Sequence, residues 1–269
     1  MKFFRYLLFS GIFVFGAVAC KKNPENLWEI EIKDSAKKTE IVDISKQFYD
    51  PNVSLEDFKS KFPWFQGTVS DEDYAVRRAD ANEAKIYKEA IAKIDVAKLN
   101  KDLSGLFSHI HHYFPEFVAP KVYLYSSALQ GIMEPIFYKP EENMLFIDIS
   151  AFMGENNPNY QGLELYFQKS MNPQNIVPKV SEVYAQFFVP RTNNHQKFID
   201  EMIYNGKIVT LQDAFLPSFP DYLKMNYTQK QHEWAVENEV NIWNYFVENN
   251  LVFSDDLRLN ERFINPGPF

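Results

Sequence analysis

The chain has 269 residues, of which 46% are hydrophobic and 16% aromatic, and its formal net charge is −8. This length suffices for one large domain or two small ones with an ample apolar core. The negative charge argues against nucleic acid as a partner, because phosphates require a basic surface, and against electrostatic adsorption to anionic lipid.

The first twenty residues have the pattern of a bacterial lipoprotein signal peptide. Lys2 and Arg5 supply positive charge, residues 6–18 are almost wholly apolar, and Cys20 follows small residues as the only cysteine of the chain. The apolar run is shorter than the about 20 residues that span a bilayer, so it is typical of a secretory leader. We therefore predict a signal peptide over 1–19 and lipid attachment at Cys20.

The residues after Cys20 indicate where the lipid anchor lies. Lys21, Lys22 and Asn23 include no aspartate that would retain a lipoprotein at the inner membrane. We expect an acylated tether over 20–27 and attachment to the outer membrane, on its periplasmic face. No later segment is apolar enough over a sufficient length to cross a membrane, so the lipid would be the only membrane contact.

Two segments early in the mature chain alternate between polar and apolar residues. Trp28–Ile32 and Glu40–Ile44 therefore predict a first pair of strands. Between them, Asp34-Ser35-Ala36 resembles the O-glycosylation signal of the Bacteroidetes envelope, which makes Ser35 a candidate site. The alternative interpretation of this tripeptide is a polar turn.

The middle of the chain mixes helices and strands. Ser54 begins a short helix with an acidic first turn, and apolar spacing predicts two longer helices over 81–97 and 99–114. Strands are expected at 121–126, 135–138 and 144–149. The last of these is continuously apolar before its aspartate, which indicates a central strand buried on both faces.

The second half is predicted to be helical. Helices are expected over 178–190 and over 195–204, the latter closed by Gly206. Thr228 has capping-box spacing and begins what should be the longest helix. Its apolar stripe consists of Val236, Val240, Trp243 and Val247. Strands early and helices late predict one α+β domain over 28–269.

Few residues have the spacing of a catalytic or metal site. His109 and His112 share a helix face, but no third ligand is readable near them, so a structural role is favoured. His232-Glu233 begins like the zinc-protease motif HExxH, yet Val236 stands where the second histidine belongs. Phosphate-binding loops and nucleophile elbows are absent from the sequence. We predict no metal and no cofactor.

An ordered series of segments resembles the gliding-motility lipoprotein family GldB of the Bacteroidetes. The matching stretches are His112–Pro115, Leu145–Ile149, Phe152–Gly154, Tyr204–Lys207, Leu216–Pro217, Tyr227–Thr228, Trp234, Asn238–Trp243, Leu251–Ser254 and Arg262–Ile264. The resemblance implies a role in gliding motility and the linked type IX secretion, with other envelope proteins of these systems as partners. Members usually continue past the position of Pro268-Phe269 with a further segment, which we expect this chain to lack.

The family is also distantly similar to zinc peptidases of the gluzincin type, which implies a zincin-like fold. In that comparison Ser181–Ala185 takes the place of the active helix, Glu182 that of the general base, and Glu201 that of the third ligand. Ser181 and Ala185 replace both histidines, so Glu182 and Glu201 would be vestigial. The resemblance implies a pseudo-metallopeptidase that is not an enzyme.

Two other functions remain open at this stage. A lipoprotein that binds glycans or small molecules could use the aromatic loops around Tyr160 and Phe167. An atypical zinc-dependent peptidase would have to use unusual ligands. Bound zinc would distinguish the peptidase, and a glycan-array signal would favour the binding protein.

Overall fold

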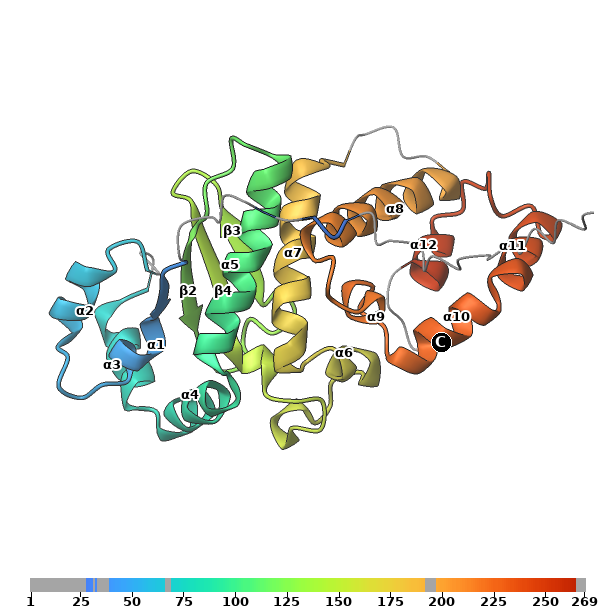
Figure 1. Ribbon diagram of the computed structural model, residues 1–269. Helices are drawn as coiled ribbons and strands as arrows, with labels where there is room; N and C mark the ends of the chain where they lie inside the picture. Colours follow the sequence, from blue (N-terminus) through green and yellow to red (C-terminus); the bar gives the residue numbers. More distant parts are fainter. Residues whose placement is uncertain (1–27, 31, 33–38, 66–68, 192–196, 265–269) are drawn as a thin grey trace, which may run out of the picture.

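The computed structural model describes residues 28–30, 32, 39–65, 69–191 and 197–264 (Figure 1). A small mixed sheet lies in the first half, and the second half is mostly helical. The predicted α+β class is therefore confirmed. None of the described helices combines the length and the apolar character needed to cross a membrane.

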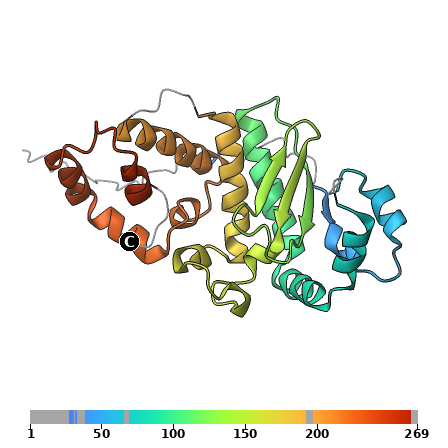
Figure 2. The same cartoon turned by 180° about the vertical axis from the view of Figure 1, so that it is seen from behind.

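The sheet has four strands in the order β1-β2-β4-β3. β1 (Ile41–Asp43), β2 (Lys121–Tyr125) and β4 (Met144–Asp148) are parallel, and β3 (Ile136–Lys139) is antiparallel to β4. The strands predicted at 121, 135 and 144 are confirmed, with β4 in the interior of the sheet (Figure 2).

The predicted first pair of strands is wrong. Residues 28–30 and 32 form no strand, and β1 pairs with β2, with Ile41 opposite Val122. The strand ends at Asp43, whose carboxylate accepts a hydrogen bond of 2.9 Å from the Lys46 amide and so caps α1 (Ile44–Phe48). Local alternation could reveal the extended segment but not its partner, which lies far along the chain.

Helices cover both faces of the sheet (Figures 1 and 2). Val122, Leu124 and Ile147 point to the main core, which they share with α4 (Ala81–Lys93), α5 (Val96–Tyr113) and α7 (Ile176–Phe188). Tyr123 and Phe146 point the other way, into an aromatic cluster with α1, α2 (Leu55–Lys61) and α3 (Asp71–Ala79). The expectation that β4 is buried on both faces is confirmed.

The second half packs on α7 and extends away from the sheet (Figure 1). It contains α6 (Leu165–Lys169), α8 (Phe198–Phe215), α9 (Asp221–Lys224), α10 (Gln229–Glu237), α11 (Glu239–Glu248) and α12 (Arg258–Phe263). Short 3-10 turns lie at η1 (Ile149–Phe152), η2 (Pro158–Tyr160) and η3 (Pro173–Asn175). A separate small core of Phe198, Phe246 and Leu259 joins α8, α11 and α12.

Two helix predictions of the second half are wrong. Gly206 does not close a helix, because α8 continues through it to Phe215. The helix that begins after Thr228 ends at Glu237, with α11 following Asn238, so it is not the longest. The predicted stripe is exposed rather than buried: Val240 is 72% exposed and Trp243 46%.

Candidate functional site

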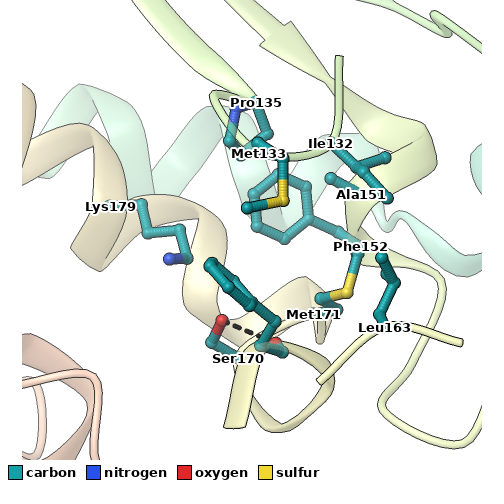
Figure 3. Close-up of a pocket in the computed structure, with 10 residues that line it drawn as sticks. Ile132, Met133, Pro135, Ala151, Phe152, Leu163, Ser170, Met171 and Lys179 are labelled. Carbon is teal, nitrogen blue, oxygen red and sulfur yellow. Dashed lines mark hydrogen bonds between the residues drawn. The ribbon is translucent and has the colours of Figure 1, made fainter. Parts of the chain in front are cut away.

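A cavity of about 40 Å³ lies beside the first turns of α7 (Figure 3). Its walls come from the loop before β3, from η1, from the segment around α6 and from α7. The lining residues are Ile132, Met133, Pro135, Ala151, Phe152, Leu163, Phe167, Ser170, Met171 and Lys179. Most of these side chains are apolar, and Lys179 is the charged one among them.

A buried carboxylate at the end of β4 holds two of these walls in place. Asp148 is fully buried, and its oxygens accept hydrogen bonds from the amides and hydroxyls of both Ser127 and Ser150. Ser127 Oγ also accepts a 2.8 Å hydrogen bond from the Gly131 amide. The loop before β3 and the turn η1 are thereby joined through one side chain.

Backbone conformation in the loop before β3 depends on the same network. Ala128 and Leu129 have φ angles of 54° and 75°, which are uncommon for residues other than glycine. Their amides donate hydrogen bonds of 3.2 Å each to Ser126 Oγ and Ser150 Oγ. Such strained conformations persist where surrounding contacts determine them, so the loop that supplies Ile132 and Met133 is firmly placed.

The tyrosine of η2 supports the opposite side of the cavity. Tyr160 is fully buried, and its hydroxyl donates a 2.7 Å hydrogen bond to the Ser150 carbonyl and accepts one of 2.8 Å from the Met153 amide. These bonds fix the ends of η1, which carries Ala151 and Phe152. Because Tyr160 is buried in the core, its ring cannot stack on a glycan, as the hypothesis of a glycan-binding lipoprotein proposed for the loops around Tyr160 and Phe167. Phe167 lines the cavity.

Lys179 and Glu182 lie one turn apart on α7 and are both partly buried. Burial lowers the pKa of the Lys179 amine, and the nearby Glu182 only partly opposes this effect. Burial likewise raises the pKa of the Glu182 carboxyl, with Lys179 opposing it. Groups with shifted pKa values beside a cavity are typical of functional sites.

The helix pair compared with a peptidase site is present, and its side chains are already engaged. Ser181 and Ala185 are fully buried. Gln212 of α8 donates hydrogen bonds of 3.1 Å to Ser181 Oγ and 3.2 Å to the Pro178 carbonyl. Ser181 therefore faces an amide on α8 at the place where the comparison would put a metal.

Glu201, the second vestigial position, is held by a different partner. It is 7% exposed and forms an ion pair with Arg191, which follows α7. The Arg191 guanidinium also lies 5.3 Å from the ring centre of Tyr204. Ser181 is thus hydrogen-bonded to Gln212, and Glu201 is paired with Arg191. These contacts do not join Ser181 to Glu201.

The histidines have structural contacts. His109 Nδ1 lies 2.9 Å from the Gly105 carbonyl oxygen, and His111 Nδ1 lies at the same distance from that of Phe117. Glu233 of the near-match on α10 is exposed, and Gln229 donates a 2.8 Å hydrogen bond to it. Within the described ranges, no group of three or more His, Cys, Asp or Glu could hold a metal ion.

Two predicted modification sites lie outside the described residues, namely Cys20 and Ser35. Two residues of the site, Lys179 and Asp148, were not predicted as site residues from the sequence. A lysine inside the apolar run of α7 was the one available signal for Lys179. Asp148 stood out only as the polar end of an apolar strand.

A family model described as "Gliding motility protein GldB" matches residues 25–269. The chain belongs to this family. The GldB assignment confirms the resemblance seen in the sequence and identifies a gliding motility lipoprotein, which implies an envelope location with a membrane anchor. Membership of this family also implies that the protein functions together with other motility or envelope proteins. Comparison with curated proteins gave no match, and neither did comparison with solved structures. The similarity to zinc peptidases stays a prediction.

Proposed function

We propose that this GldB protein is an outer-membrane lipoprotein, held at the periplasmic face by a lipid on Cys20. It supports gliding motility and the linked type IX secretion machinery through contacts with other envelope proteins, and it does not catalyse a reaction. The observation that carries this proposal is the family match over residues 25–269. The net charge of −8 favours protein partners with basic patches.

The contacts of the α7–α8 pair support the non-catalytic part of the proposal. A zinc peptidase needs three protein ligands and an open position for water. Ser181 is buried against Gln212, and Glu201 is paired with Arg191, so both are engaged in contacts that stabilise the helix pair. The scaffold then contributes shape and surface rather than a metal centre.

The test is surface spreading and export of a secreted adhesin in a strain that lacks the gene. Both should be lost, and the intact gene should restore them. Glu182→Gln should restore them equally well, as should Glu248→Gln, which changes an exposed residue of α11 and serves as the matched control. Normal spreading and export without the gene would contradict the proposed role. Loss of function in Glu182→Gln alone, at a normal protein level, would contradict the absence of catalysis.

A further inference from the structure

We propose that the cavity beside α7 binds a carboxylate that carries a short apolar group, with Lys179 as its cationic partner. This inference concerns a ligand site and does not rest on the proposed role in motility. It is carried by the size of the cavity and by its lining, which is apolar apart from Ser170 and Lys179, with Lys179 at its edge (Figure 3).

The cavity selects for a small apolar group. One water-sized probe occupies about 10–15 Å³, so a ligand part of about three or four heavy atoms can enter. A cavity volume of about 40 Å³ sets this limit. Ser170 Oγ already donates a 3.0 Å hydrogen bond to the Phe167 carbonyl. A polar ligand body would lose its hydrogen bonds to water among Met133, Phe152 and Met171, and this loss is unfavourable.

The charge of Lys179 selects for an anion. Lys224, the buried lysine of α9, forms ion pairs with Asp213 and Asp221, the latter at 2.7 Å. Lys179 forms no such ion pair with any residue of the described chain, although Glu182 lies one turn away. A ligand carboxylate would supply this counter-charge through a charge-assisted hydrogen bond in a partly desolvated place.

Two sources share this chemistry. One is a free short-chain carboxylic acid, and the other is the C-terminal carboxylate of a peptide that ends in a small apolar residue. In the second case the rest of the peptide would lie outside the cavity. A free acid and a peptide C-terminus can be distinguished with probes of both kinds, each compared with the amide that lacks its carboxylate.

Methionine methyl groups give a local readout. Met133 and Met171 line the cavity, so their signals in the full chain labelled with ¹³C at the methionine methyls should report binding. Propionate should shift both signals in a saturable manner, and propionamide, which has the same shape without the charge, should bind at least about tenfold more weakly. In the peptide arm, Gly-Gly-Ala with a free C-terminus is compared with its C-terminal amide. Tighter binding of the free peptide than of propionate would identify a peptide terminus as the ligand; the reverse order would identify a free acid.

Variants assign the effect to the charge. Lys179→Gln should weaken propionate binding at least about tenfold, and Lys169→Gln, an exposed lysine of α6, should leave it unchanged. At a pH above the raised pKa of Glu182, Glu182→Gln should tighten it about threefold, because a negative charge near the site is removed. Equal binding of propionate and propionamide, undiminished binding in Lys179→Gln, or no shift of either methionine signal would overturn the proposal. The two-probe comparison in the unaltered chain decides the matter even if Lys179→Gln fails to fold.

Discussion

Single buried polar residues determine how the loops of this protein are placed. Asp148, at the end of β4, links the segment after β2 to η1 through one hydrogen-bonded network. The sequence pattern indicates only that this residue ends a strand. Its carboxylate accepts from two amides and two hydroxyls. An amide side chain could not replace it, because its nitrogen would face donors.

Asp148→Asn should therefore lower the free energy of unfolding by about 3 kcal/mol, since it leaves buried donors unsatisfied. Denaturant unfolding of the purified protein measures this change. Asp255→Asn alters an exposed aspartate and should change stability by less than about 0.5 kcal/mol. Equal stability of Asp148→Asn and the unaltered protein would show that the network does not stabilise the fold.

Glu182 gives stability a dependence on pH. Because burial raises its pKa in the folded protein, the folded state retains a proton that the unfolded state loses, and stability falls as pH rises above about 4.5. Glu182→Gln lacks this fall. Its stability should equal that of the unaltered protein near pH 4 and exceed it above about pH 4.5, with the difference growing until the pH passes the raised pKa of Glu182 in the folded protein.

Unfolding curves measured across this pH range provide the test, with Glu248→Gln as the exposed control. A difference between Glu182→Gln and the unaltered protein that stays constant with pH would contradict the expected titration. Burial lowers the pKa of the neighbouring Lys179, and this lysine is present in all of the compared proteins.

Individual helices differ in how much of their stability is local. α10 has no buried residue, so its capping box contributes a large part of what holds its first turn. Thr228 Oγ1 accepts from the Gln231 amide at 3.2 Å, and Gln231 Oε1 accepts from the Thr228 amide at 2.8 Å. The sequence pattern predicted this box correctly because the interaction spans three residues.

Thr228→Ala should destabilise α10 by about 1 kcal/mol, which corresponds to roughly fivefold faster hydrogen exchange of its amides. Exchange measured by NMR or mass spectrometry gives this quantity. Thr210→Ala, on α8, removes an exposed hydroxyl that donates to the Gly206 carbonyl and should leave α10 unaffected. Unchanged exchange in α10 of Thr228→Ala would mean that tertiary contacts alone hold the helix.

Helices and strands could be predicted where the interactions that form them join residues close in sequence. Strands at 121–126 and 144–149 were evident from their apolar side chains, and capping residues such as Ser54 and Thr228 marked helix starts. The helix end predicted at Gly206 was wrong, because contacts of α8 with α7 outweigh the low helix propensity of glycine. The cavity at Lys179 was not predictable, since segments from four parts of the chain converge there.

At the scale of the whole molecule, the number of residues between Cys20 and Trp28 limits how far a lipid on Cys20 can lie from the folded part of the chain. The ring of Trp28 packs against Tyr113 at the end of α5, with 6.1 Å between the ring centres. Trp28 is the eighth residue after Cys20, and an extended chain covers at most about 3.6 Å per residue. With Cys20 as the anchor, the lipid lies within about 29 Å of Trp28.

Cys20→Ala should move the protein from the membrane fraction to the soluble periplasmic fraction, because the lipid is the expected membrane contact. Fractionation followed by immunoblotting measures the distribution. Ser10→Ala, a change within the leader that leaves Cys20 in place, should keep the protein in the membrane fraction. Full membrane retention of Cys20→Ala would contradict the lipid anchor.

The pairing of β1 with β2 imposes an order on folding. Ile41 and its partner Val122 are about 80 residues apart, and β2 in turn lies beside β4, which ends at Asp148. Contacts so distant in sequence form slowly, because a long loop must close before they stabilise anything. A chain that emerges N-terminus first thus exposes β1 and the aromatic side chains of α1–α3 until more than half of its length is available. β1 and α1–α3 are therefore synthesised early, yet they pack only after β2 and β4 have been made.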